Sequence, residues 1–468
     1  MAGLVILCVL LGLGHVCRSK VKLLQRLYLP SCVVGGLLGL ICVQGILLLG
    51  GSEDSSPLYA FVEEICQTWR AIPGFLINVV FACLFLGVAL PKASELWKRA
   101  GPQVVYGQMV AWGQYVVGLG AWVLVLGHLF PDLPGMFAGI LPVGFEGGHG
   151  TAAGMGPVFA ERGWEAGTDL ALSSATFGIL SAIIVGTGLI NWAVRSGHVE
   201  HVKQQDFGGE YDTAGIIPCD RRPSAGKLSV NADAIESFSL HLVAVGLAIG
   251  VGMLLKLGLV AIEGSSVYLT RHKLLSSFPL FPLCMLGGLL MQWLEIRFDR
   301  HRLIDLGLIR RIQNSSLDFL VVAAIATIRV KVVAHALVPL LILVVLGIGW
   351  NVACVVLLAR RVFKDAWFER AIAEMGQSMG VTASGLLLLR IVDPDYETAA
   401  ADAFACKQII HEPFMGGGLW TSTAIPLIAI YGPARVLWIA LGAMGIWTTV
   451  LVAGRYLRRG SNPLTPVS

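Results

Sequence analysis

Apolar runs of about 20 residues recur along the whole chain, and runs of this length can cross the roughly 30 Å of hydrocarbon in a bilayer. The eleven predicted spans cover 2–17, 30–50, 72–91, 102–130, 166–194, 237–262, 275–294, 315–335, 337–359, 401–431 and 433–456. Of the 468 residues, 56% are apolar and 14% are charged, whereas soluble domains carry about 25% charged residues. The mean hydropathy of +0.75 is too high for a chain folded in water. The sequence therefore predicts an all-α polytopic membrane protein.

Two more apolar stretches, about 135–160 and 371–392, are too rich in Gly and polar residues to be ordinary spans. We interpret both as re-entrant loops, because unwound backbone is tolerated at membrane depth only where it is buried in protein or lines a cavity. With this assignment Lys and Arg gather in alternate loops. The positive-inside rule then places the N-terminus outside and the C-terminus inside.

Matching segments indicate that the chain contains two related halves. Pro30–Leu38 matches Pro282–Leu290 without a gap, and Thr151–Gly154 matches Thr382–Gly385. Each half has five spans, an odd number, so the second copy must be inverted in the membrane. Inverted repeats with a site at their interface are typical of secondary transporters.

This repeat divides the chain into four parts. We predict a first inverted repeat over 1–194, a cytoplasmic linker over 195–236, a second repeat over 237–432, and an extra span with a cytoplasmic tail over 433–468.

The strongest local signal is the Gly-rich segment Gly144–Gly156. So many Gly residues disfavour a continuous helix and leave backbone groups free to face a cavity. The N-termini of broken helices suit a substrate carboxylate, while carbonyl and Thr hydroxyl oxygens suit Na⁺. The competing interpretation is a Gly-lined face for helix packing.

Glu146 and His149 lie three residues apart within this segment, so on any helical turn they share a face. A charge inside the membrane costs about 2.5 kcal/mol or more, so each needs a partner or water. They are candidates for cation ligation, proton transfer or substrate recognition. The alternative is a hydrogen bond between the two that holds the loop together.

Polar residues also mark the second loop and the tenth span. Gln377 stands where His149 stands in the first loop, and a polar stripe runs along the tenth span from Asp402 through Lys407 and His411 to Glu412. The stripe either lines the transport pathway or forms a satisfied buried network. Arg390 can bind a substrate carboxylate or form a surface ion pair with nearby Asp residues.

Several of these segments resemble the bacterial sodium:glutamate symporter family. Gly147–Ala153 is similar to the family's re-entrant motif, Ser174–Gly178 to the Ala-Thr-Phe-Gly element that follows it, and Pro30–Leu38 to an early Gly-Gly-Leu-Leu element. The resemblance extends to about residue 432, although Met375–Gly385 departs from the family's second loop. It implies a homodimer that works by an elevator mechanism, with glutamate and Na⁺ held by the two loops.

On these grounds we predict a sodium-coupled transporter for uptake of glutamate or a related small carboxylate, in the bacterial cytoplasmic (inner) membrane. The alternative is a proton-coupled transporter of another organic anion. HExxH does not occur, so we expect no enzyme activity. We also expect no cofactor, no metal beyond transported Na⁺ and no nucleic-acid partner.

The candidate site residues fall into two groups. Those assigned to the substrate are Gly148, His149, Gly150, Thr151, Thr176, Gln377, Thr382 and Ser384, and those assigned to the ion are Glu146, Thr151, Ser174 and Asp402.

Overall fold

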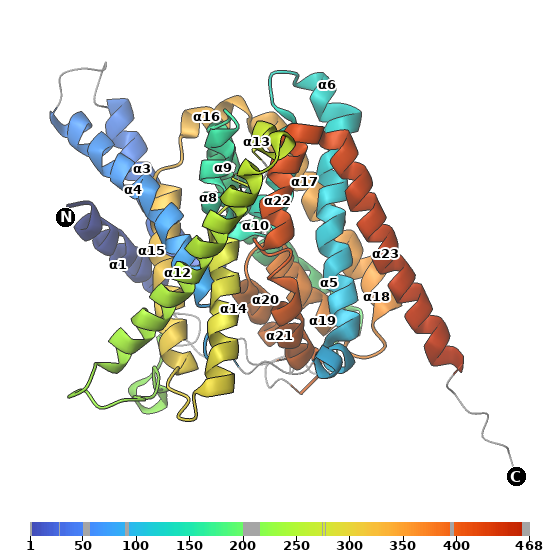
Figure 1. Ribbon diagram of the computed structural model, residues 1–468. Coiled ribbons are helices and arrows are strands. Elements are labelled where there is room, and N and C mark those ends of the chain that lie inside the picture. Colours follow the sequence, from blue (N-terminus) through green and yellow to red (C-terminus); the bar gives the residue numbers. More distant parts are fainter. Residues whose placement is uncertain are drawn as a thin grey trace, which may run out of the picture.

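The computed structural model describes residues 2–27, 29–49, 57–88, 93–199, 216–273, 275–276, 278–393 and 397–460 (Figure 1). All regular structure within these ranges is helical. Helices satisfy their own backbone hydrogen bonds, which is what a bilayer without water requires. Seven of the described helices are long and apolar enough to cross a membrane.

One group of helices forms a bundle on the left of Figure 1. Its members are α1 (Ala2–Lys20), α3 (Ser31–Leu49), α4 (Pro57–Ala82), α12 (Ser237–Gly264), α14 (Phe281–Phe298) and α15 (Leu306–Ala326), with the short α2 (Lys22–Arg26) after α1. Within this bundle α3 packs on α1 and α15, while α14 packs on α12 and α4. The bundle therefore contains two similar sets of three helices.

The glycines of the two matching sequence segments make these contacts. A Cβ on Gly35 would collide with the backbone of α1, and one on Gly287 with the backbone of α12. At the next position, a Cβ on Gly36 would meet a side chain of α15, and one on Gly288 the backbone of α4. Corresponding glycines thus allow the same close helix packing in both halves.

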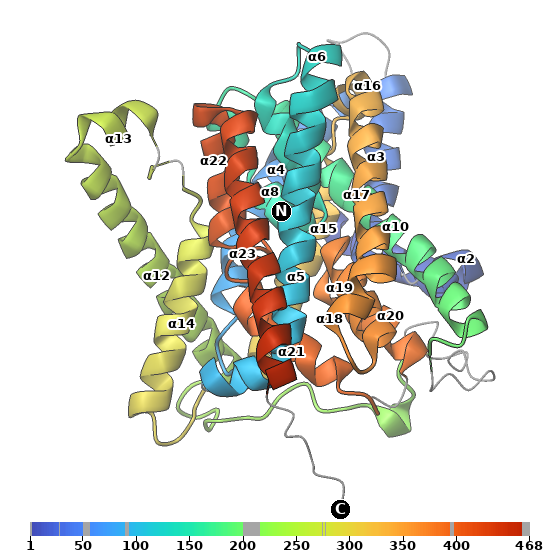
Figure 2. The ribbon, with the colours of Figure 1, turned by 90° about the vertical axis from the view of Figure 1, so that its right-hand side faces the viewer.

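A second group of helices surrounds the two predicted re-entrant loops on the right of Figure 1. It comprises α5 (Ala93–Ala121), α10 (Ala166–Arg195), α17 (Leu337–Ala353), α21 (Ala400–His411), α22 (Leu419–Tyr431) and α23 (Pro433–Gly460). Both α5 and α17 continue into a five-residue π-helical segment, Trp122–Leu126 and Cys354–Leu358, and then into α6 (Gly127–Leu129) and α18 (Ala359–Val362). Figure 2 shows α23, the predicted extra span, running along α5, with which it packs.

Three predicted spans differ most clearly from the observed helices. Helix α4 begins at Pro57, well before the predicted start at 72, because its first half is amphipathic and hydropathy alone misses it. The span 315–335 ends at Ala326, and a separate short helix, α16 (Val330–His335), follows. The span 401–431 is not continuous, because Pro413 and Gly416–Gly418 separate α21 from α22.

The predicted linker 195–236 is described only in part, since residues 200–215 lie outside the described ranges. Its remaining portion after residue 215 holds one short 3₁₀ turn, Cys219–Arg221. On the other side of the molecule, α13 (Val267–His272) connects α12 to α14.

Candidate functional site

The first Gly-rich segment folds into a broken, buried hairpin. A 3₁₀ turn (Gly135–Gly139) leads into α7 (Ile140–Gly144), and α8 (Gly148–Gly154) and α9 (Gly156–Glu161) return. The helix breaks at Phe145–Gly147, and Gly148 has a φ of +66°. This left-handed conformation is costly for residues with a Cβ, so glycine is favoured where the chain reverses.

Glu146 lies in this break and is only 4% exposed. Its Oε1 accepts a hydrogen bond from Gln377 Nε2 at 3.0 Å and lies 2.6 Å from His411 Nε2. Its Oε2 is buried without a hydrogen-bond partner among the described residues. One carboxylate oxygen therefore remains available to a ligand.

His149 and Glu146 do not lie on one helical turn, because Glu146 is in the break and His149 is in α8. Its Nε2 lies 3.0 Å from Thr176 Oγ1 on α10, whereas the partners of Glu146 among the described residues are Gln377 and His411. The break at Phe145–Gly147 separates α7 from α8, so the i, i+3 relationship of a continuous helix does not apply to this pair. The pairing of His149 with Thr176 does bring two of the predicted substrate residues together.

The second loop is also a helical hairpin, formed by α19 (Trp367–Ser378) and α20 (Thr382–Val392). Its tip meets the tip of the first hairpin, since a Cβ on Gly148 would lie 3.3 Å from the carbonyl oxygen of Gly380. Thr382, at the start of α20, donates to Glu412 Oε1 at 2.9 Å and accepts from Gln408 Nε2 at 2.7 Å. The hairpin is thereby bonded to the α21 segment.

A cavity of about 470 Å³ lies between the two hairpin tips and helices α4 and α15. Its lining combines apolar side chains from α4 with polar residues from both hairpins, α15 and the α21 segment. The polar lining residues are Glu146, Thr151, Arg310, Gln313, Asn314, Gln377, Thr382, Gln408 and Glu412. Five of the predicted site residues, from both loops, thus line one cavity: Glu146, Gly150, Thr151, Gln377 and Thr382.

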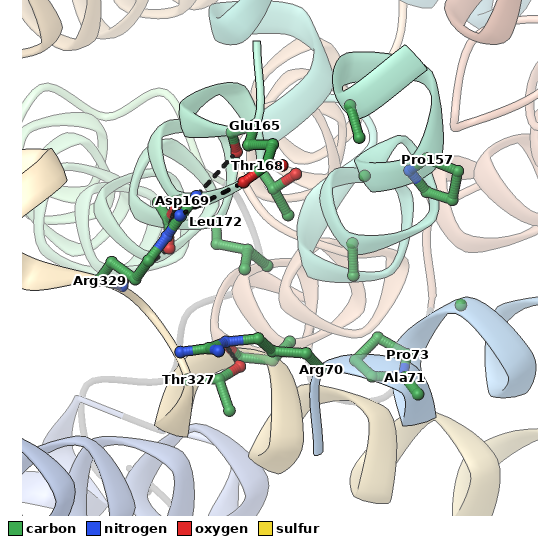
Figure 3. A pocket seen from close by; sticks show the side chains of 15 residues that line it. Arg70, Ala71, Pro73, Pro157, Glu165, Thr168, Asp169, Leu172, Thr327 and Arg329 are labelled. Carbon is green, nitrogen blue, oxygen red and sulfur yellow. Dashed lines mark hydrogen bonds and ion pairs between the residues drawn. The ribbon is translucent and has the colours of Figure 1, made fainter. Parts of the chain in front are cut away.

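A second cavity of about 440 Å³ lies along the same contact between α4 and the first hairpin (Figure 3). It is lined by residues nearer the start of α4, by α9 and by the first turn of α10. Here Arg329 holds Asp169, with its Nε 2.9 Å from Asp169 Oδ2 and its backbone N–H 2.7 Å from Oδ1. Glu165 lies 3.7 Å from the same guanidinium.

Thr151 and the predicted residues outside the cavity lining occupy different environments. Thr151 lines the first cavity and is 1% exposed, and its hydroxyl has no hydrogen-bond partner among the described residues. Ser174 is fully buried against α7, where a Cβ on Gly144 would collide with it. Ser384 is buried on α20 beside Gly380. Asp402 is not brought to the cavity: its side chain is 61% exposed, 3.8 Å from Arg99.

Part of the site was not assigned from the sequence. Glu374 and Lys407 are both fully buried, and their charged atoms lie 2.6 Å apart. Gln103 and Gln108 on α5 bond to Glu374 Oε2 at 2.9 Å and to His411 Nδ1 at 3.3 Å. The two glutamines, five residues apart in an apolar helix, could have indicated this network from the sequence, because an amide side chain inside a membrane requires hydrogen-bond partners. Lys407 and His411 of the polar stripe thus belong to a buried network, whereas Asp402 is exposed. Glu412, the last residue of the stripe, lines the cavity together with Gln408.

Two broken hairpins whose tips meet beside a polar cavity, within a bundle of apolar helices, define a secondary transporter. The comparison with protein families identifies which kind. The chain belongs to the sodium/glutamate symporter family, whose model matches residues 1–389. No curated protein matches the chain, and no solved structure does.

This membership makes the chain a multi-pass membrane symporter, and symporters are not a class of enzyme. The match ends within α20, whereas the sequence resemblance was expected to continue to about 432. Helices α21 and α22 lie beyond the matched residues.

Proposed function

We propose that this protein takes up glutamate or a related small carboxylate by coupling its entry to Na⁺. The observation that carries the proposal is the first cavity, to which both hairpins contribute polar groups. A site built from two broken hairpins near mid-membrane is how secondary transporters bind substrate and ion together. Family membership supports the choice of Na⁺ and glutamate.

The chemistry of the lining suits an amino acid that carries a second carboxylate on its side chain. Arg310 brings a positive charge to the wall formed by α15, where it can pair with a substrate carboxylate. Glu412, a half-buried lining residue that follows α21, can pair with a substrate ammonium group. Gln377 and Thr382 add an amide and a hydroxyl to the same lining.

The ion would bind at oxygens that lack protein partners. Glu146 Oε2 and Thr151 Oγ1 are both buried, unpaired among the described residues, and on residues that line the cavity. A carboxylate and a hydroxyl are hard oxygen ligands of the kind that alkali and alkaline-earth cations prefer. A bound Na⁺ would satisfy both atoms and offset the cost of burying them.

We further propose an elevator-type motion of the hairpin group against the α1–α15 bundle. The two cavities support it, because they lie at different heights along the contact of α4 with the first hairpin. Sliding along this contact would carry the substrate site from the level of the first cavity on α4 to the level of the second. The equivalent glycine contacts in α3 and α14 support the inverted repeats 1–194 and 237–432.

The setting of the transporter is also a proposal. A homodimer in a bacterial inner membrane, with the N-terminus outside and the C-terminus inside, agrees with the family resemblance and with the distribution of Lys and Arg.

The test is uptake of labelled glutamate into proteoliposomes with separately imposed Na⁺ and H⁺ gradients. We expect stimulation by Na⁺ and strong impairment by Glu146→Gln and by Thr151→Ala, with both variants inserted and folded. The matched control is Asp402→Asn, a carboxylate outside the cavity. Uptake by both site variants with unchanged kinetics and Na⁺ dependence would refute the site, and lack of stimulation by Na⁺ would refute the coupling.

One observation favours the alternative of a proton-coupled carrier for another organic anion. Glu146 and His411 form a buried pair at 2.6 Å, and such a pair can hold a proton between a carboxylate and an imidazole. In this case an inward H⁺ gradient would drive uptake without Na⁺, and His411→Gln would abolish the response.

A further inference from the structure

Lys407 is the most deeply buried cation among the described residues, with 0% of its side chain exposed. Its Nζ lies 2.6 Å from Glu374 Oε1, 2.9 Å from Gln377 Oε1 and 2.9 Å from Gln408 Oε1. An ammonium group has three N–H donors and no acceptor. Two of them donate to the amide oxygens of Gln377 and Gln408, and the ammonium forms an ion pair with Glu374 Oε1. The three oxygens come from α19 and α21, on either side of the ammonium.

Independent contacts hold each of these oxygens in place. Glu374 Oε2 accepts from Gln103 Nε2 at 2.9 Å, while Gln377 Nε2 donates to Glu146 at 3.0 Å and Gln408 Nε2 donates to Thr382 at 2.7 Å. Each amide nitrogen is thus engaged elsewhere, and its oxygen is left facing the ammonium. The oxygen cage does not depend on Lys407 alone for its geometry.

The donor set is that of a binding site for a small hard cation. One carboxylate and two amide oxygens are the ligands such ions prefer. The cage is also next to the transport site, since Gln377 and Gln408 line the first cavity. A free ion in the cavity would reach the cage if the lysine were absent.

We infer that the Lys407 ammonium is a tethered cation that occupies a monovalent cation site formed by Glu374, Gln377 and Gln408. The inference rests on the proposed function, in which Na⁺ enters the neighbouring cavity. A fixed positive charge at this position balances Glu374 permanently, so no coupling ion binds there. Sodium is then required only at the separate pair of oxygens on Glu146 and Thr151.

The decisive variants remove the ammonium with and without its carboxylate. Lys407→Ala leaves Glu374 as a buried negative charge beside a vacant space, and an unpaired buried charge is strongly destabilising. A ligand that binds only the folded state raises its stability as the ligand concentration increases. The double variant Lys407→Ala with Glu374→Gln has the same space but no charge to attract a cation.

The assay is thermal unfolding of the purified full chain in detergent, titrated with NaCl or with choline chloride at equal ionic strength. For Lys407→Ala we expect a low Tm in choline and a saturating rise in Na⁺ that exceeds the rise of the wild type. The Tm of the double variant should respond to Na⁺ no more than the Tm of the wild type does. Lys407→Ser, which adds a hydroxyl oxygen to the site, should show the same Na⁺ response as Lys407→Ala.

Equal Na⁺ responses in the single and double variants would overturn the inference. Failure of Lys407→Ala and Lys407→Ser to fold in Na⁺ would also overturn the inference, whether or not the double variant folds. In that case Na⁺ does not replace the ammonium. The readout is separate from transport. Wild-type uptake that ignores Na⁺ would refute the proposed function, while a Na⁺ response confined to the single variants would still establish the cation site.

Discussion

Asp169 joins the first turn of α10 to the residue that precedes α16, and its removal gives a quantitative test of the fold (Figure 3). Its side chain is 7% exposed and that of Arg329 is 40% exposed. Oδ1 accepts from the Arg329 backbone at 2.7 Å, and Oδ2 lies 2.9 Å from both Nε and Nη2. The carboxylate thus holds both the backbone and the side chain of the segment after α15.

The expected magnitude follows from this partial burial. Hydrogen bonds to charged groups contribute about 1.5–3 kcal/mol each, and breaking a buried ion pair costs about 3–5 kcal/mol. Arg329 keeps access to water, so its charge is hydrated when Asp169 is lost. We therefore expect Asp169→Ala to lower the free energy of unfolding by about 3 kcal/mol, at the lower limit of that range. Asp169→Asn keeps an acceptor for the backbone N–H and should cost about half as much.

The matched control uses the same guanidinium. Glu165 lies 3.7 Å from Arg329 Nη1 and is 73% exposed, so Glu165→Ala should cost less than about 1 kcal/mol, as exposed pairs do. Unfolding is followed by tryptophan fluorescence in micelles with increasing amounts of a denaturing detergent. If Asp169→Ala and Glu165→Ala unfold at the same point, the Asp169 contact does not stabilise the fold and the reasoning is wrong.

Three further predictions concern the site. Gly148→Ala should strongly reduce uptake. A left-handed residue with a Cβ is strained by about 1–2 kcal/mol, and this Cβ would press on the second hairpin. The control is Gly163→Ala, where Gly163 has a similar φ of +74° but open space around it, so uptake should stay intact. Thr176→Val should reduce uptake by leaving buried His149 without its hydroxyl partner, at a cost of about 1–3 kcal/mol. Asp402→Asn should change stability by less than about 0.5 kcal/mol, because its contact with Arg99 is exposed.

These variants are measured by Na⁺-driven uptake into proteoliposomes and by the same unfolding assay. Equal loss of uptake in Gly148→Ala and Gly163→Ala would show that hairpin contact is not the cause. Thr176→Ser, which keeps the hydroxyl, should restore uptake, and failure to do so would contradict the role given to the hydrogen bond. A large effect of Asp402→Asn on uptake would return this residue to the site.

The sequence predicted well what depends on local pattern. Membrane spans were recognised from runs of apolar residues, and the two hairpins from Gly and polar residues that interrupt such runs. The prediction failed where local pattern is ambiguous. The amphipathic first half of α4 has too little net hydropathy, and Pro413 and Gly416 within an apolar run did not prevent the assignment of a single span over 401–431.

By itself, the sequence determined that this is an all-helical membrane protein of the sodium/glutamate symporter family with two interrupted segments. Only the tertiary structure decided which charges meet. Glu146 bonds to His411, 265 residues away, rather than to His149 three residues away, and Lys407 bonds to Glu374 across two helices. Neighbours within a helix follow from its periodicity, but partners on different helices depend on how a broken hairpin turns and which bundle it packs against.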